Sequence, residues 1–251
     1  MSPPIITAPS TPFVPGSVKP EADYLRMQQL GTQLGLPVMM AHLRVAAVDQ
    51  DGVQGDVVED RSRTFTRNYW NMIFNIVAQV TMPTGTFGAG SLVMKDKSSV
   101  TPTQYGNGIS ALFASAKGTL GIQSYSGFIA GDENSYITVG SGSAAESFDG
   151  LAMSAPIVSG SAAGQLLYGT PPMPANNYNA GTRTWTATPI RYFNNATAAT
   201  IVVTETGIYG GIAGGYSNMF LFARDLLPAS VAVLPGGQLT VAYSFSLVFP
   251  A

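Results

Sequence analysis

The sequence predicts a mainly β protein: a β-sandwich or jelly-roll-like domain with one amphipathic helix and an extended, proline-rich N-terminal arm. Three observations indicate this class. Several short apolar segments are separated by turns rich in glycine, proline and asparagine. The last segment, residues 238–249, alternates between large apolar and small residues. Only residues 64–80 combine a clear helical period with an aromatic stripe, which we interpret as core packing.

The composition indicates a subunit of an assembly. Hydrophobic residues make up 45% of the 251 residues and charged residues only 10%, whereas an ordinary soluble domain has about 25% charged residues. A free monomer with so few charges would have a weakly solvated surface. We therefore expect a homo-oligomer, specifically a homotrimer. The net charge of −2 without a basic stripe argues against nucleic-acid binding, and the apolar runs are too short for a transmembrane helix.

Four regions are predicted along the chain. Residues 1–20 form the extended arm, and residues 21–83 form a helix-containing part that packs on the β domain. Residues 84–134, rich in glycine, serine and threonine, form a loop or insertion, and residues 135–251 form the β-sandwich. The first fifteen residues lack the basic start and the unbroken apolar run of a signal peptide.

The N-terminal arm has two interpretations. Six prolines in residues 1–20 exclude a helix and favour an extended, polyproline-like backbone. A solvated tail would satisfy this composition, but it would not need the apolar residues Ile5, Ile6, Phe13 and Val14. We favour an arm that lies across a neighbouring subunit, with these four side chains as its anchors.

Local patterns predict the individual elements. A short helix is expected over residues 21–34, and Thr64 is the expected N-cap of the second helix. Turns are expected at residues 49–52 and 140–142, and a loop at residues 171–181. The expected strands are residues 38–48, 136–139, 165–168, 182–193, 200–206, 219–224 and 238–249. In the last strand the odd-numbered residues should point inward, because they carry the large apolar side chains.

No constellation for catalysis, cofactor binding or metal binding is predicted. The chain has no cysteine, and His42 is its only histidine, which lies in an apolar stretch. The turn at residues 140–142 lacks the further glycine, the lysine and the following helix of a phosphate-binding loop. The acidic pairs at residues 59–60 and 132–133 lie in polar segments without the aromatic residues of a sugar-cleaving site. We expect that the protein is not an enzyme.

Two charged residues, Glu205 and Arg224, lie within the most apolar parts of the sequence. Glu205 lies within a strand pattern, and Arg224 follows the run Leu221-Phe-Ala. Because buried charges need partners, we expect Glu205 and Arg224 to form a structural ion pair between adjacent strands.

Several motifs, taken in order, resemble virion structural proteins of tailed bacteriophages. In that group a Ser-φ-x-Arg-Asn-φ helix start (φ is an apolar residue), a Val-Gly-Thr-Gly turn, a Glu-x-Gly-Leu-Tyr strand, an Arg-Asp strand and a Gly-x-x-Leu-x-Val-x-Tyr final strand recur. The final strand here departs by one position, because its leucine follows Gly237 sooner. The corresponding segments are Ser62-Arg-Thr-Phe-Thr-Arg-Asn-Tyr-Trp-Asn71, Ile137-Thr-Val-Gly-Ser-Gly142, Val203-Thr-Glu-Thr-Gly-Ile-Tyr209, Leu221-Phe-Ala-Arg-Asp225 and Gly237-Gln-Leu-Thr-Val-Ala-Tyr-Ser-Phe245.

This resemblance implies a non-enzymatic particle protein, located in the virion and assembled in the host cytoplasm. The arm and the sandwich favour a capsid decoration (cement, or minor capsid) protein, whose partners are its own copies, the major capsid protein or other virion proteins. A tail or fibre-attachment protein is the first alternative. A carbohydrate-binding surface module is the second, with Tyr178, Trp185 and Tyr192 as candidate contacts, although core packing would explain Trp185 and Tyr192 equally well.

Overall fold

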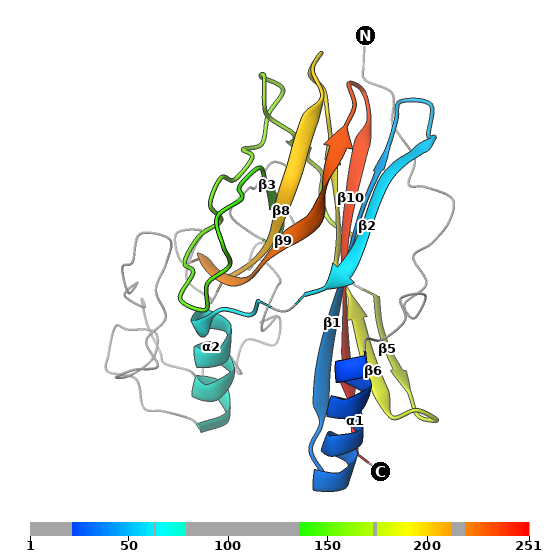
Figure 1. Ribbon diagram of the computed structural model, residues 1–251, viewed down its shortest axis with the longest axis vertical. Coiled ribbons are helices and arrows are strands. Elements are labelled where there is room, and N and C mark those ends of the chain that lie inside the picture. The colour runs from blue at the N-terminus through cyan, green and yellow to red at the C-terminus, as the bar shows by residue number, and fades with distance from the viewer. Residues whose placement is uncertain (1–21, 63, 79–135, 173–174, 212–218, 251) are drawn as a thin grey trace.

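A computed structural model of the protein describes residues 22–62, 64–78, 136–172, 175–211 and 219–250. These residues form two antiparallel β-sheets and two helices (Figure 1). The sheets pack face to face around one apolar core, so the mainly β, sandwich-type fold is confirmed. The jelly-roll topology stays a prediction.

The larger sheet has seven strands and is built around the last one. The strand order is β2-β1-β10-β6-β5, and β7 pairs with β10 and with β4. The eleven residues of β1 pair without interruption with those of β10, from Val38 opposite Val248 to Val48 opposite Gln238. The strands are β1 (Val38–Val48), β2 (Gln54–Arg61), β4 (Leu167–Tyr168), β5 (Ala175–Asn179), β6 (Thr184–Thr188), β7 (Ile190–Asn194) and β10 (Gln238–Val248).

The smaller sheet covers only part of the larger one. It consists of β3 (Tyr136–Gly140), β8 (Ile201–Gly211) and β9 (Met219–Val233), in the order β3-β8-β9. Side chains from both sheets fill the core, including Leu43 and Val241 from the larger sheet. The ends of β1 and β10 near α1, together with β5 and β6, extend beyond the smaller sheet (Figure 1).

The predicted facing of the final strand is correct for its first half. Leu239, Val241 and Tyr243 are fully buried in the core. Phe249, predicted to point inward, is instead 40% exposed, because it follows the end of β10, beyond the cover of the smaller sheet. The even-numbered Ser244 is also buried, since it is small and lies directly opposite the longer His42 of β1.

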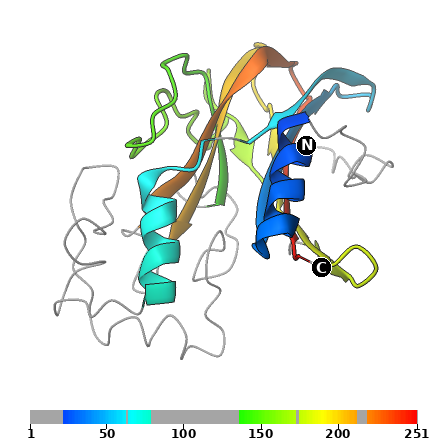
Figure 2. The same cartoon turned by 60° about the horizontal axis from the view of Figure 1, so that its bottom comes forward.

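The first helix, α1 (Ala22–Leu34), lies where the sequence predicted it, against β1 (Figure 2). Its contact with the sheet is close because Gly31 is buried there. A Cβ atom at Gly31 would lie 2.3 Å from Val38 Cγ2, which is too short for a real contact. Gln28 Nε2 also donates to Met40 Sδ of β1 at 3.4 Å.

The second helix, α2 (Arg67–Ala78), begins later than predicted. Thr64 is not its N-cap, because the Thr64 hydroxyl donates to the Arg224 carbonyl and, at 2.9 Å, to Asp225 Oδ1 of β9. Thr66 directly precedes the helix, and its hydroxyl donates to the Leu221 carbonyl at 2.5 Å. These contacts fix the start of α2 on β9.

The positions of several strands also differ from those predicted. Strand β2 was not predicted, and β5 lies inside the segment predicted as a loop at residues 171–181. The predicted strand at residues 182–193 is two strands, β6 and β7, separated at Pro189, which lacks the N–H that a continuous ladder needs. Because β1 pairs with β10, residues 135–251 do not form the sandwich alone.

Candidate functional site

The predicted pair of Glu205 and Arg224 is present at the junction of β8 and β9. Arg224 Nε donates to Glu205 Oε2 at 2.5 Å, and the two side chains are 8% and 0% exposed, respectively. In the β8–β9 ladder, Gly207 lies opposite Arg224, so the two charged residues are diagonal neighbours on adjacent strands. The sequence-based expectation of a buried structural pair is confirmed.

Both members of the pair also hold the segment that follows β3. Arg224 Nη1 and Nη2 donate to the carbonyls of Ala145 and Ala144 at 3.1 and 2.7 Å. Glu205 accepts hydrogen bonds from the backbone N–H of Ala155 at 2.8 Å and of Ser154 at 3.3 Å. The guanidinium and the carboxylate are thus paired with each other and with backbone groups, which offsets the cost of burying them.

Two glycines make room for the Glu205 carboxylate. A Cβ atom at Gly140 would lie 2.5 Å from Glu205 Oε1, and one at Gly142 would lie 2.4 Å from the same oxygen. Residues 140–142 do not form the predicted turn. Gly140 ends β3, and Ser141 N donates to the Ala155 carbonyl at 2.9 Å. The glycines therefore serve the close approach of a side chain and not a change of chain direction.

A second buried polar cluster surrounds Asp225. Its Oδ2 accepts hydrogen bonds from the hydroxyls of Ser62 at 2.8 Å and Tyr243 at 3.0 Å, and its Oδ1 accepts one from Thr64. Thr206 Oγ1 lies 2.7 Å from the Tyr243 hydroxyl. Burial, followed by the nearby Asp225 carboxylate, raises the pKa of Tyr243 well above its usual value. This cluster joins β9 to the final strand and to the segment before α2.

These clusters have the properties of structural networks. Glu205 is fully buried and Asp225 is 3% exposed, so neither carboxylate reaches solvent where a substrate would bind. His42 is half-buried in β1, opposite Ser244 on one side and Arg61 on the other. Within the described ranges, no three His, Asp or Glu side chains gather in a group that could hold a metal ion. The acidic residues 132–133 lie outside those ranges.

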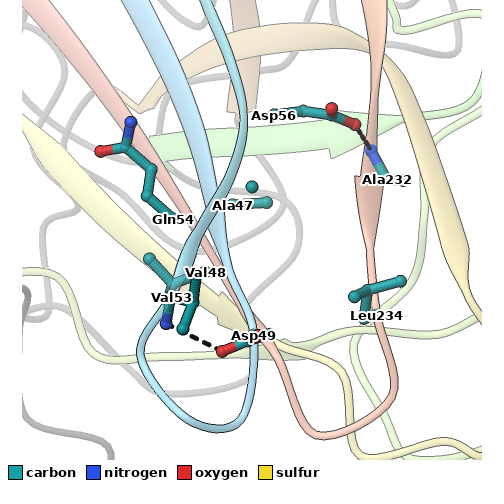
Figure 3. A pocket seen from close by; sticks show the side chains of 9 residues that line it. Ala47, Val48, Asp49, Val53, Gln54, Asp56, Ala232 and Leu234 are labelled. Carbon is teal, nitrogen blue, oxygen red and sulfur yellow. Dashed lines mark hydrogen bonds between the residues drawn. The ribbon is translucent and has the colours of Figure 1, made fainter.

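An open pocket of about 270 Å³ lies between the β1–β2 hairpin and the end of β9 (Figure 3). Its carboxylates are engaged with the backbone. Asp49 Oδ1 accepts from Val53 N at 2.8 Å, and Asp56 Oδ2 accepts from Ala232 N at 3.0 Å. The Asp49 bond closes the predicted turn at residues 49–52. With both carboxylates bonded to the backbone, the lining of the pocket does not point to a specific ligand. Its other lining residues are Ala47, Val48, Gln54, Gly55 and Leu234.

Exposed apolar side chains gather at the opposite end of the molecule, which we call the apolar end. It comprises α1, the adjoining ends of β1 and β10, and the β5–β6 hairpin, drawn at the bottom of Figure 1. The segments 22–43, 175–188 and 244–250 contain only three charged residues, Asp23, Arg26 and Arg183. The large exposed side chains here are Leu25, Met27, Leu30, Leu34, Leu36, Tyr178, Trp185 and Phe249.

One part of the apolar end is a stripe on α1. Met27, Leu30 and Leu34 are 48%, 53% and 61% exposed, respectively, and their spacing puts them on one side of the helix. The helix contacts the sheet through Gln28 and Gly31 instead. The apolar side of this helix is therefore an exposed surface and not a buried face.

The other part of the apolar end is an aromatic cluster on the β5–β6 hairpin. Tyr178 and Trp185 are directly opposite each other, both 47% exposed, with ring centroids 6.0 Å apart and a tilt of 32°. The ring of Phe249 lies 6.3 Å from that of Tyr178. The alternative prediction that Trp185 packs in the core is thus wrong, because its side chain is exposed. Tyr192 is half-buried. In the sequence, the only sign of this surface was that Tyr178 and Trp185 flank a short turn whose single charged residue is Arg183.

The predicted arm anchors Ile5, Ile6, Phe13 and Val14, like the predicted insertion at residues 84–134, lie outside the described residues. No described helix is long and apolar enough to cross a membrane. Comparison of the chain with protein-family models, with curated proteins and with solved structures finds no match.

Proposed function

We propose that this chain is a structural subunit of a tailed-bacteriophage virion, and specifically a capsid-associated decoration (cement, or minor capsid) protein. In this role it stabilises the head through contacts between subunits, without catalysis, cofactor or metal. The observation that carries the proposal is the apolar end, where exposed leucine, methionine and aromatic side chains lie among almost no charges. Contiguous exposed apolar surface marks interaction sites in soluble proteins.

The chemistry of this surface favours a protein partner. Aromatic residues and methionine are enriched in the buried centres of interfaces, and charged residues are depleted there. Met27, Tyr178 and Trp185 are exposed in the single chain, and the segments of the apolar end contain only three charged residues. Nucleic-acid backbones require clustered positive charge, so a nucleic-acid partner is disfavoured. The partners we propose are further copies of the chain and the major capsid protein or other virion proteins.

The assignment to a phage particle is supported by the order of the sequence motifs between Ser62 and Phe245. Two of the charged residues in these motifs, Glu205 and Arg224, form the buried pair, so this part of the motif pattern corresponds to a physical requirement of this sandwich. The same motifs suit a tail or fibre-attachment protein, which remains the first alternative. We favour the head because an extended arm and a sandwich suit a protein that spans neighbouring capsid subunits.

Labelling of particles tests the proposal. Antibodies raised against the purified chain, imaged with gold on intact particles, are expected to mark the head. Label confined to the tail would overturn the decoration role in favour of the tail alternative, and particles without label would overturn both. Light scattering of the purified chain at micromolar concentration should also report an oligomer. A monomer under all conditions would overturn the assembly role.

The exposed aromatic cluster favours one candidate from another class, a carbohydrate-binding module. Tyr178 and Trp185 are neighbouring exposed aromatic rings, and a sugar ring can stack on such a ring. Trp70→Phe leaves Trp185 as the only tryptophan, so its fluorescence can be followed during titration with chitohexaose and maltohexaose. A saturable change that Tyr178→Ala removes would support this function, and constant fluorescence would exclude it for these two sugars.

A further inference from the structure

The edge strands of the two sheets have backbone groups on one side that pair with no other described strand. An edge strand presents unpaired N–H and C=O groups, and soluble proteins normally protect such edges with charges, proline, short length or a covering segment. Among the described strands, β2, β4 and β5 lie at edges of the larger sheet, and β3 and β9 lie at those of the smaller one. Each edge can therefore be checked for its protection.

The edges at β2 and β4 are protected. Strand β2 carries the exposed acidic residues Asp56 and Glu59, which oppose addition of a further strand. Strand β4 is only two residues long, and Tyr168 N of that strand donates to Ser159 Oγ at 3.3 Å. Neither strand offers a continuous uncharged edge.

The edges at β3 and β9 are covered by other parts of the chain. The segment after β3 folds back along it, so that Ile157 N donates to the Val139 carbonyl at 2.9 Å. Residues 64–66 run along β9, where Thr66 N donates to the Phe222 carbonyl at 2.9 Å. Pro228 within β9 removes one further donor.

Among the described residues, no charge, no proline and no covering segment protects strand β5. It pairs only with β6 among the described strands, and its sequence Ala-Asn-Asn-Tyr-Asn contains no charge and no proline. The side chains of Asn176, Asn177, Tyr178 and Asn179 are all exposed. Alternate residues of an antiparallel strand direct their N–H and C=O groups away from the paired neighbour. As far as the described part of the chain is concerned, this edge is thus uncovered and uncharged, and it can serve as a template for another strand.

We propose that β5 of one copy pairs antiparallel with β5 of a second copy, so that the larger sheets of two copies join into one. This inference rests on the proposed assembly function and names the contact that serves it. Asn177 is the central residue of the five-residue strand, so it lies opposite its own equivalent across a twofold axis. Asparagine carries both donors and an acceptor, and the opposed amides can therefore bond to each other.

The neighbouring side chains support a second copy as the occupant. Tyr178 and Trp185 stand on one face beside this edge, and their equivalents would extend the same face across the junction. The β5–β6 hairpin is also bonded to the residues after β10, because Arg183 Nη1 donates to the Pro250 carbonyl at 2.8 Å and Phe249 N donates to the Arg183 carbonyl at 3.0 Å. An uncharged, self-complementary edge favours association with itself, and its hydrogen bonds to the chain end reduce the freedom that pairing would remove.

Twofold pairing of β5 predicts how many copies of the chain the oligomer contains. If the chain has no other self-contact, the oligomer is a dimer. If it also forms the trimer expected from its composition, pairing of two trimers through β5 gives a hexamer with three twofold axes. In both cases, loss of the β5 contact should halve the mass of the particle in solution.

Charge substitutions at Asn177 test the contact in the full chain. Asn177→Lys places two positive charges opposite each other, and Asn177→Asp places two negative charges there. Each variant alone should have half the mass of the unmodified protein by light scattering, and an equimolar mixture of the two should regain the full mass. Gln54→Lys, which adds the same charge to the exposed start of the protected β2 edge, should keep the full mass.

The outcomes separate this inference from the proposed function. Variants that keep the full mass, or a mixture that stays at half mass, would overturn β5 pairing while the assembly role stands. An unmodified protein that is monomeric would overturn the assembly role itself. Circular dichroism checks that each variant is folded, and because both charge variants must fold to regain mass on mixing, misfolding cannot imitate the expected result.

Discussion

Arg224 Nε lies 2.5 Å from Glu205 Oε2, and this contact joins two strands to the segment that follows β3. The pair is buried, and its remaining groups are bonded to backbone atoms of residues 144–145 and 154–155. Removal of one member therefore leaves a buried charge and also frees backbone groups that it had satisfied.

A double-mutant cycle measures this coupling. Glu205→Gln and Arg224→Met should each lower the free energy of unfolding by about 3–5 kcal/mol, because each leaves an uncompensated charge or unsatisfied backbone groups. The double variant should lose much less than the sum, since the two losses share one cause. Denaturant melts of the four proteins supply the measurement. Additive losses would mean that the two side chains do not interact in solution.

The N-terminal arm is tested by truncation. Deletion of residues 1–20 should leave the sandwich folded, because the core described here is built from residues after them. Incorporation of the truncated protein into particles should fall, because Ile5, Ile6, Phe13 and Val14 are the expected anchors on a neighbouring subunit. Sedimentation of particles followed by immunoblotting measures incorporation. Normal incorporation would refute the arm, and an unfolded truncated protein would show that the arm belongs to the sandwich.

The two halves of the final strand should differ in their contribution to stability. Leu239 is fully buried, and Leu239→Ala should cost about 2–5 kcal/mol through lost burial and a residual cavity. Phe249 is 40% exposed at the apolar end, and Phe249→Ala should cost less than about 1 kcal/mol although it removes the larger side chain. Thermal or denaturant melts separate the two. A larger loss for Phe249→Ala would contradict the position of the smaller sheet.

Buried tyrosines make alkaline stability a test of the core. Burial raises the pKa of Tyr69 to about 12 and that of Tyr243 well above the usual value of about 10. Above pH about 10 the unfolded chain releases these protons and the folded chain retains them, so stability is complete below that pH and falls as pH rises through the folded-state pKa.

Tyr243→Phe should therefore weaken the decline in stability with pH above about 10, although it also removes the hydroxyl that donates to Asp225. Urea midpoints measured at increasing pH give the slope for both proteins. A slope that is the same in the variant would mean that Tyr243 ionises as readily in the folded chain as in the unfolded one.

The sequence predicted those elements whose signal is local. Residues 38–48 and 238–249 were expected as strands because 38–48 is mostly apolar and 238–249 alternates between large apolar and small residues, and both form. Strand β2 gave no such signal, because Val58 is its one buried residue and its other positions are polar or exposed. Its conformation depends on pairing with β1, which is a contact between segments and not a local preference.

The candidate sites also include some that the sequence predicted and some that only the structure revealed. The sequence by itself determined that Glu205 and Arg224 would meet, because a charge within an apolar strand must find a partner. The tertiary structure alone decided that Trp185 and the α1 stripe face solvent and that β5 is an edge strand among the described strands. The periodicity of a segment shows which residues share a face. Whether that face is buried depends on how far the second sheet extends over it, and here the smaller sheet does not reach the apolar end.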